Sequence, residues 1–149
     1  MRIYPDASFL VSWLYTPDIH NRKARTWFSA HQAADWIPSD WSRFETLNTL
    51  RGLCLRTNGP RPELVEALRR YFNHLIHCGP FEFERTDWQE VLRDANQISA
   101  GFAARIKARS ADTLHIAILE QINPDLFVSG DRDQIALATS RGFQALSFL

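Results

Sequence analysis

The stretch SADTLHIAILEQINPDLFVSGDRD, residues 110–133, joins an apolar helix to an apolar strand and then to an acidic turn. From Ala111 to Gln121 there is almost no polar face, and a helix that is apolar all round is a buried helix. Leu126 to Val128 form an uninterrupted apolar run, which is typical of a central strand in a parallel sheet. The stretch therefore predicts an α/β fold in which Asp131 follows a central strand.

The rest of the chain continues this alternation of helices and strands. Helical periodicity covers residues 7–15, 18–34, 39–57, 62–78, 87–107, 110–122 and 132–141. Strand-like runs fall near residues 2–4, 35–38, 81–85, 126–129 and 143–147. The pattern predicts a central parallel sheet flanked by helices. With 149 residues, 45% of them hydrophobic, the chain is expected to form a single domain over residues 1–149.

Composition says little about the type of partner. Seventeen basic residues balance seventeen acidic ones, so the net charge does not favour nucleic acid. Fifteen of the basic residues are Arg, which suits phosphate recognition, although genome composition can produce the same bias. Cys54 and Cys78 form no CxxC pair, the first residues lack an apolar signal region, and no run approaches the roughly 18 apolar residues of a membrane span. We expect a reduced, cytoplasmic protein with no membrane segment.

Four acidic residues fall where an α/β fold brings distant side chains to one point. Asp6 and Asp131 each follow a predicted strand, and ligands of parallel sheets bind at the carboxyl ends of strands. Asp112 opens the apolar helix, where a carboxylate is costly unless something pairs with it. Glu45 lies on the predicted helix 39–57. Such a cluster is suited to hold a divalent metal ion.

The first two acids also have ordinary structural interpretations. Asp6 can cap the helix that follows it, since Asp is a favoured N-cap residue. Ser8 can support a metal-bound water or make a local bond to the backbone. Glu45 stands three residues after Ser42, which is the spacing of a capping box. Helical spacing alone places Glu45 on a solvated face.

The later acids have similar alternatives. Asp112 can complement the helix dipole after an N-cap at Ser110. Asp131 fits a turn after which Asp133 can cap the next helix. His115 lies one turn after Asp112 and is more readily a core histidine than a supporting residue of a site. Each acid alone is therefore ordinary, and only the set points to function.

Aromatic residues crowd the first third of the chain. They are Trp13, Trp27, Phe28, Trp36, Trp41 and Phe44. Core packing is the more common role of such residues, and a hydrophobic groove for a partner is the alternative.

Taken together, these motifs resemble those of a PIN domain, in particular a VapC-type toxin ribonuclease. The resemblance rests on Asp6 after the first strand, Glu-Thr-Leu-Asn at 45–48, Ala-Asp-Thr-Leu-His-Ile-Ala at 111–117 and Phe-Val-Ser-Gly-Asp-Arg-Asp at 127–133. It covers almost the whole chain, although residues 17–100 match only in helical layout and in the motif at 45–48.

This resemblance implies a PIN-like three-layer sandwich with a set of metal-binding acids. By the resemblance, the catalytic residues that bind Mg²⁺ or Mn²⁺ are Asp6, Glu45, Asp112 and Asp131, and the secondary polar residues are Ser8, Asn48 and Asp133. Gly130 stands where a polar residue is more usual. This departure leaves open whether Asp131 or Asp133 makes the closer metal contact.

The resemblance also implies a function, which is that of a cytoplasmic metal-dependent endoribonuclease, the toxin of a toxin-antitoxin pair. RNA would be its substrate, a small antitoxin its inhibitor, and a homodimer its assembly. Candidate contacts to the RNA backbone are Arg22, Lys23, Arg25, Arg105, Lys107 and Arg109, for which a solvated helix face is the alternative. Candidates for an antitoxin groove, beside which a partner Arg would pair with the acids, are Trp13, Trp27, Trp41 and Phe44.

Two rival functions remain at this point. One is a catalytically silent PIN-like module that binds RNA or protein. The other is a metal-dependent phosphatase with Asp6 as nucleophile, which is disfavoured because Ser8 stands where such enzymes usually have a second Asp.

Overall fold

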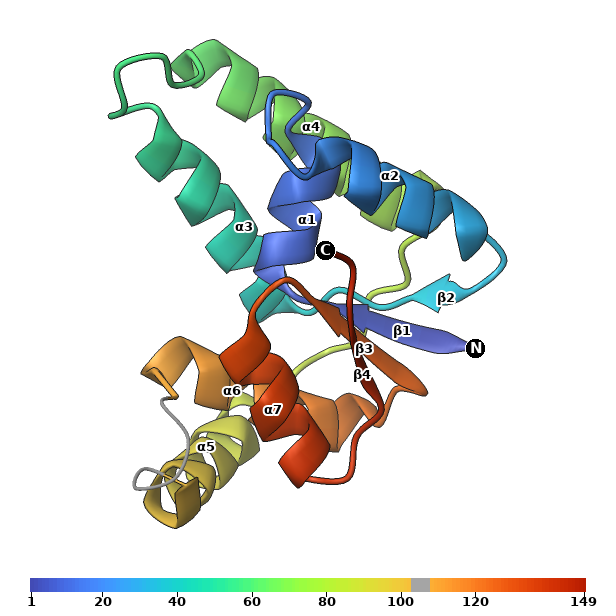
Figure 1. The fold of residues 1–149 in the computed structure, drawn as a ribbon, viewed down its shortest axis with the longest axis vertical. Coiled ribbons are helices and arrows are strands. Elements are labelled where there is room, and N and C mark those ends of the chain that lie inside the picture. The colour runs from blue at the N-terminus through green and yellow to red at the C-terminus, as the bar shows by residue number, and fades with distance from the viewer. Residues whose placement is uncertain (103–107) are drawn as a thin grey trace.

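A four-stranded parallel sheet with the strand order β2-β1-β3-β4 lies at the centre of the fold (Figure 1). The computed structural model describes residues 1–102 and 108–149. The strands are β1 (Arg2–Pro5), β2 (Asp35–Trp36), β3 (Leu126–Ser129) and β4 (Ala145–Ser147). The helices are α1 (Ala7–Leu14), α2 (Asn21–Ala30), α3 (Asp40–Leu53), α4 (Pro62–Cys78), α5 (Trp88–Phe102), α6 (Ser110–Ile122) and α7 (Arg132–Ser140).

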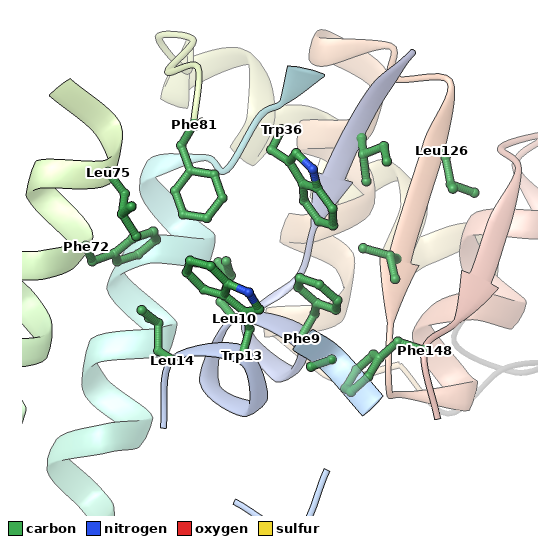
Figure 2. Close-up of a cluster of buried hydrophobic side chains, with 13 residues drawn as sticks. Phe9, Leu10, Trp13, Leu14, Trp36, Phe72, Leu75, Phe81, Leu126 and Phe148 are labelled. Carbon is green, nitrogen blue, oxygen red and sulfur yellow. The ribbon is translucent and has the colours of Figure 1, made fainter. Parts of the chain in front are cut away.

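The two faces of the sheet carry separate parts of the core, because successive side chains along a strand point to opposite faces. Ile3 packs in a cluster with residues of α1, α2 and α4. Tyr4 and Phe127 pack instead with residues of α5, α6 and α7. Figure 2 shows the first cluster, in which Phe9 of α1 packs edge-on against Phe148 with ring centroids 5.2 Å apart. The predicted three-layer α/β arrangement is confirmed.

The strand order reverses between β1 and β3. From β1 the chain continues to β2 on one side of the sheet, and from β3 it continues to β4 on the other. The backbone N–H of Asp6 donates to the carbonyl oxygen of Val128 at 3.1 Å, so the ends of the two strands are held together. The crevice at such a reversal is where ligands of parallel sheets bind. Asp6 and Asp131 leave the sheet at this point.

One predicted strand is wrong. Residues 81–85 contribute only an isolated bridge between Phe81 and Trp36. The alternation of Phe81 and Phe83 with two glutamates has the period of a strand, but Phe83 is exposed and gives the segment no second buried position. Sequence alternation alone does not distinguish such a loop from an edge strand.

Several predicted helices begin later or end earlier than expected. The helix predicted over 18–34 begins at Asn21, because the carboxylate of Asp18 accepts the His20 N–H in a turn. The helix predicted over 39–57 ends at Leu53, against whose carbonyl the backbone of Gly59 packs closely. Residues 103–107 of the helix predicted over 87–107 lie outside the described residues. None of the helices in the described parts of the chain is long and apolar enough to cross a membrane.

Candidate active site

Three of the four predicted acids line one cavity at the carboxyl ends of β1 and β3. The cavity has a volume of about 310 Å³, and its lining includes Asp6, Glu45 and Asp131. Asp112 lies behind it, 2% exposed, and accepts a hydrogen bond from Gln134 of the cavity wall at 3.0 Å. Side chains from β1, α3, α6 and β3 therefore gather at the reversal of strand order.

Asp6 is both a helix cap and a buried site residue. Its Oδ1 accepts the Phe9 N–H at 2.9 Å, which caps α1 as the sequence predicts. The hydroxyls of Ser8 and Ser129 donate to the same carboxylate, each at 2.7 Å. Burial raises the pKa of Asp6, while the nearby His115 and these hydrogen bonds act in the opposite direction. A buried carboxylate held in one orientation favours a cation beside it.

The turn after β3 holds Asp131 at the mouth of the cavity. The Oδ1 of Asp131 accepts the backbone N–H groups of Asp133 and Gln134, so Asp131 caps α7. The prediction that Asp133 is the cap is wrong, because α7 begins at Arg132, two residues earlier than a cap at Asp133 would allow. Asp133 is exposed and is not part of the cavity lining.

The surroundings of Gly130 explain why a glycine stands in this turn where a polar residue is more usual. Its N–H donates to the Ser8 hydroxyl at 2.8 Å. A Cβ atom at this position would lie 3.0 Å from the Phe148 ring and 3.2 Å from the Ser8 oxygen. The close approach of three chain segments leaves little room for a side chain here.

Asp112 is paired on both sides. Its Oδ2 accepts the backbone N–H of Arg109 at 2.7 Å, and its Oδ1 accepts the side-chain amide of Gln134 at 3.0 Å. The predicted N-cap at Ser110 is wrong, since Arg109 is the N-cap and Ser110 is the first helical residue. The remaining amide oxygen of Gln134 is buried with no hydrogen-bond partner among the described residues.

Glu45 is held by a chain of buried hydrogen bonds. The Nε2 of His115 lies 2.8 Å from the Oε2 of Glu45, and its Nδ1 lies 2.8 Å from the Tyr4 hydroxyl. That hydroxyl lies 2.9 Å from the Ser39 hydroxyl. Burial raises the pKa of Tyr4 far above its usual value, so the hydroxyl keeps its proton.

The role of Glu45 follows from where α3 begins. The capping box predicted for Ser42 and Glu45 is wrong, because the box is formed by Ser39 and Ser42 one turn earlier. Glu45 is thereby free of a capping role, and its side chain is 28% exposed rather than fully solvated. One turn further along α3, Thr49 lines the cavity, whereas the predicted Asn48 is exposed and does not.

A cation from the chain itself already contacts the acids. The guanidinium of Arg109 lies 3.2 Å from Asp131 and 3.5 Å from Asp112, and its side chain is 75% exposed. Arg105 and Lys107, the other predicted backbone contacts of this segment, lie outside the described residues. Arg22, Lys23 and Arg25 are exposed on α2.

The donor set fits a hard divalent cation. Within residues 1–102 and 108–149, no three His, Cys, Asp or Glu side chains already converge closely enough to hold a metal ion. Carboxylate oxygens are nevertheless the ligands that Mg²⁺ and Mn²⁺ prefer, and the side chains of Glu45 and Asp131 are partly exposed, so an ion can reach them from solvent. The unpartnered oxygen of Gln134 is a further acceptor beside them.

Two residues of this site, Gln134 and Tyr4, are not predicted from the sequence. Gln134 stands three residues after Asp131, so it lies in the first turn of the helix that Asp131 caps. That spacing is the one signal that points to it. Tyr4 lies in a buried strand, and nothing in its apolar neighbours indicates its hydrogen bond to His115.

The predicted antitoxin groove divides among different places. Trp13 belongs to the core, where it packs against Phe28 and Phe81, so its prediction as a groove residue is wrong. Trp27 lines a groove beside the end of the chain. Trp41 and Phe44 line another groove, of about 640 Å³.

Comparison with known proteins gives one family and several similar folds. The model of the PIN domain family matches residues 3–140. No curated protein sequence matches the chain. VapC20 of Mycobacterium tuberculosis, described as a Sarcin-Ricin loop cleaving toxin, is 16% identical, with a TM-score of 0.69 and 95% of each chain covered.

Two further structures extend this likeness in fold. FitAcB of Neisseria gonorrhoeae is 14% identical, with a TM-score of 0.59, over 98% of this chain and 97% of the other. VapBC2 of Rickettsia felis, described as bound to a DNA fragment from its promoter, is 8% identical, with a TM-score of 0.66, over 99% and 98% of the two chains. At these identities the likeness shows the fold.

Proposed function

Because the chain belongs to the PIN domain family, we propose that it is a metal-dependent endoribonuclease and the toxin of a toxin-antitoxin pair. The observation that carries the proposal is the meeting of Asp6, Glu45 and Asp131 on one cavity, with Asp112 buried behind it. The similarity to a structure described as a Sarcin-Ricin loop cleaving toxin supports RNA as the class of substrate.

Mg²⁺ or Mn²⁺ is the cofactor that this donor set fits. The residues that would hold it are Asp6, Glu45, Asp112 and Asp131. When bound, such an ion supplies neutralisation of charge on the phosphodiester and activation of water for attack on phosphorus.

The residues of the chain orient these acids. Ser8 and Ser129 fix the carboxylate of Asp6, and Gln134 fixes that of Asp112. His115 holds Glu45 toward the cavity from the far side of the sheet. Fixed donors and acceptors need no reorganisation when charge develops in the reaction, which is how such sites lower a barrier.

Arg109 is suited to bind the substrate phosphate. Its exposed guanidinium faces two of the acids and can exchange these contacts for a phosphate oxygen, since Arg matches the geometry of phosphate as well as that of carboxylate. Single-stranded loops of structured RNA are the natural substrates, because their phosphates can enter a cavity of this size.

We also propose a small antitoxin as partner, seated in the groove of Trp41 and Phe44. Leu47 and Trp88 complete its apolar lining, and Arg43, Arg51 and Arg69 stand around it. Phe44 is 55% exposed, so its ring is open to contact from solvent. Aromatic and Arg side chains are the typical anchors of protein interfaces.

The alternative is a catalytically silent module that binds RNA or protein. The ion pairs of Arg109 favour it, because a guanidinium that already neutralises two of the acids lowers their demand for metal. A nuclease assay separates the two functions.

The assay compares purified wild type with Asp6→Asn and Asp112→Asn on RNA, on single-stranded DNA and on a small phosphate ester. Asp94→Asn serves as a matched control, because Asp94 lies on α5 and only pairs with Arg93. We expect wild type and the control to cleave RNA in Mg²⁺ or Mn²⁺ and to stop in chelator. Each site variant should lose at least roughly a hundredfold in rate, as loss of a metal ligand costs several kcal/mol. Equal cleavage by all four proteins would refute the assignment.

A further inference from the structure

A second groove, of about 690 Å³, lies between α2 and the residues that follow β4. Arg22 and Lys23 line it, with Trp27 and Phe148 as apolar walls, and no acidic residue is part of its lining. Among the residues that the structure describes, neither of these two cations takes part in an ion pair. The side chains that line the groove therefore include two cations and no acid, beside apolar residues.

This basic groove borders the acidic cavity. Phe148, which Figure 2 shows beside Phe9, and the Ser8 hydroxyl of the cavity both approach Gly130, since a Cβ atom there would lie 3.0 Å from the Phe148 ring and 3.2 Å from the Ser8 oxygen. Asp18, which lines the cavity, also stands four residues before Arg22, which lines the groove. A polymer that places one phosphate in the cavity has neighbouring phosphates within reach of this surface.

The basic groove can supply the positive charge that the acidic cavity lacks for holding a nucleic acid. An acidic cavity by itself repels a nucleic acid, so a strand must be held by cations outside it. Proteins that bind single strands combine a basic groove along the backbone with aromatic side chains beside the bases. Arg22 and Lys23 supply the first element, and the half-buried Trp27 supplies aromatic surface, with the buried Phe148 as part of the wall.

We propose that this groove binds the backbone of the single-stranded RNA segment next to the scissile phosphodiester. The inference rests on the proposed ribonuclease function and deepens it by giving the substrate a direction, from the acidic cavity past Phe148 toward α2. Arg22 and Lys23 are positioning residues, since they contact phosphates that do not react.

The experiment measures binding apart from cleavage. Fluorescence anisotropy gives the affinity of a labelled single-stranded RNA of mixed sequence for the full chain in chelator, both as wild type and as Asp112→Asn. The groove variants are Arg22→Ala, Lys23→Ala and the two combined. Arg93→Ala is the control, because Arg93 is also an exposed cation but lies on α5 and lines neither the groove nor the cavity.

We expect each single groove variant to bind RNA roughly fivefold more weakly, and to lower the slope of log affinity against log salt by about 0.7, the value for one phosphate contact on a single strand; the double variant should lower the slope by about 1.4. Arg93→Ala should match wild type. Circular dichroism melting checks that all variants fold. Equal affinities and equal salt slopes for the groove variants and Arg93→Ala would overturn the proposal. So would loss of binding to an acidic peptide with RNA binding unchanged, which would assign the groove to a protein partner.

Kinetics in Mg²⁺ distinguish failure of this inference from failure of the proposed function. Groove variants that bind RNA weakly while wild type cleaves no RNA would retain the groove and refute the enzyme. If wild type cleaves RNA, the groove variants should raise KM and leave kcat unchanged. An unchanged KM would refute the groove and retain the enzyme.

Discussion

The Nε2 atom of His115 lies 2.8 Å from the Oε2 atom of Glu45, a residue 70 positions earlier in the chain. His115 is fully buried and belongs to the helix that Asp112 opens, so one helix both supplies one acid and orients another. Its other ring nitrogen contacts Tyr4 of the central strand. The position of Glu45 is therefore fixed from the sheet rather than from its own helix.

The first prediction concerns His115. Replacement by Ala should lower kcat for RNA cleavage by roughly tenfold or more, with a smaller change in KM, because Glu45 loses the group that orients it. His115→Gln, whose amide can reach Glu45 as Nε2 does, should recover part of the loss. The measurement is steady-state cleavage at saturating Mg²⁺. If His115→Ala and His115→Gln are equally impaired in kcat, positioning of Glu45 is not the role of His115.

The second prediction concerns pH. Because burial raises the pKa of Tyr4, the folded chain keeps this proton above about pH 10, where an unfolded Tyr loses it. The folded state then binds more protons, so the free energy of unfolding must fall as pH rises, by up to about 1.4 kcal/mol per pH unit.

Tyr4→Phe lacks this titrating group and tests the sign. The variant should be less stable than wild type near neutral pH, since His115 and Ser39 lose a partner, and the gap should narrow above about pH 10. Urea unfolding from about pH 8 to about pH 11 measures both curves. A constant gap over that range contradicts the linkage.

The third prediction concerns metal binding without turnover. Mn²⁺ or Mg²⁺ should raise the melting temperature of wild type, because an ion that binds only the folded state stabilises it by mass action. The double variant Asp6→Ala with Asp112→Ala should show little shift, and Asp94→Ala should behave as wild type. A melting temperature that does not respond to millimolar metal favours the silent module.

The fourth prediction concerns Arg109. Removal of its guanidinium by Arg109→Ala should let Mn²⁺ raise the melting temperature at several-fold lower concentration, because a competing cation no longer contacts Asp112 and Asp131. Cleavage of RNA should nevertheless fall, since a phosphate contact is lost. The Mn²⁺ concentration that raises the melting temperature of Arg109→Lys should lie between those for wild type and for Arg109→Ala. Tighter metal binding with unchanged cleavage would mean that Arg109 only screens the acids.

The fifth prediction concerns the proposed antitoxin. The product of the neighbouring gene should co-purify with the chain, and Phe44→Ala should weaken the complex by removing an exposed anchor. Phe83→Ala is the matched control, as Phe83 is also exposed but lies outside the groove. Changing an Arg of the partner's C-terminal segment to Ala should relieve inhibition of cleavage even where the complex still forms. If no partner can be isolated and the free chain is harmless in cells, the toxin function is wrong.

The sequence predicts those parts of the fold whose cause is local. Runs such as Leu126 to Val128 are apolar because the strand is covered on both faces, and acids directly after such strands reach the carboxyl edge of the sheet. Asp6 and Asp131 were therefore placed correctly at that edge. The strand predicted over 81–85 is wrong because alternation is a property of the local sequence, whereas pairing with another strand depends on the rest of the fold.

The contacts that complete the site arise from tertiary packing and leave weaker traces. Tyr4, His115 and Glu45 come from three elements, and no spacing rule connects them. The capping box predicted for Ser42 and Glu45 is wrong because Ser39 and Ser42 can both act as caps, and the box that forms begins at Ser39. Trp13 and Trp41 both belong to the aromatic-rich first third of the chain. Only the packing of α1 against the sheet makes Trp13 a core residue, while Trp41 lines a groove.

The order of the strands also determines when the site can form during synthesis of the chain. β1 is made first, yet Asp6 receives a hydrogen bond from Ser129, 123 residues later, and depends on β3 for its neighbours in the sheet. Synthesis proceeds from the N-terminus, so a nascent chain holds Asp6 and Glu45 long before the turn that carries Asp131 exists. The cavity cannot assemble until translation has passed that turn. For the proposed ribonuclease, the fold itself postpones activity until the turn after β3 has been synthesised.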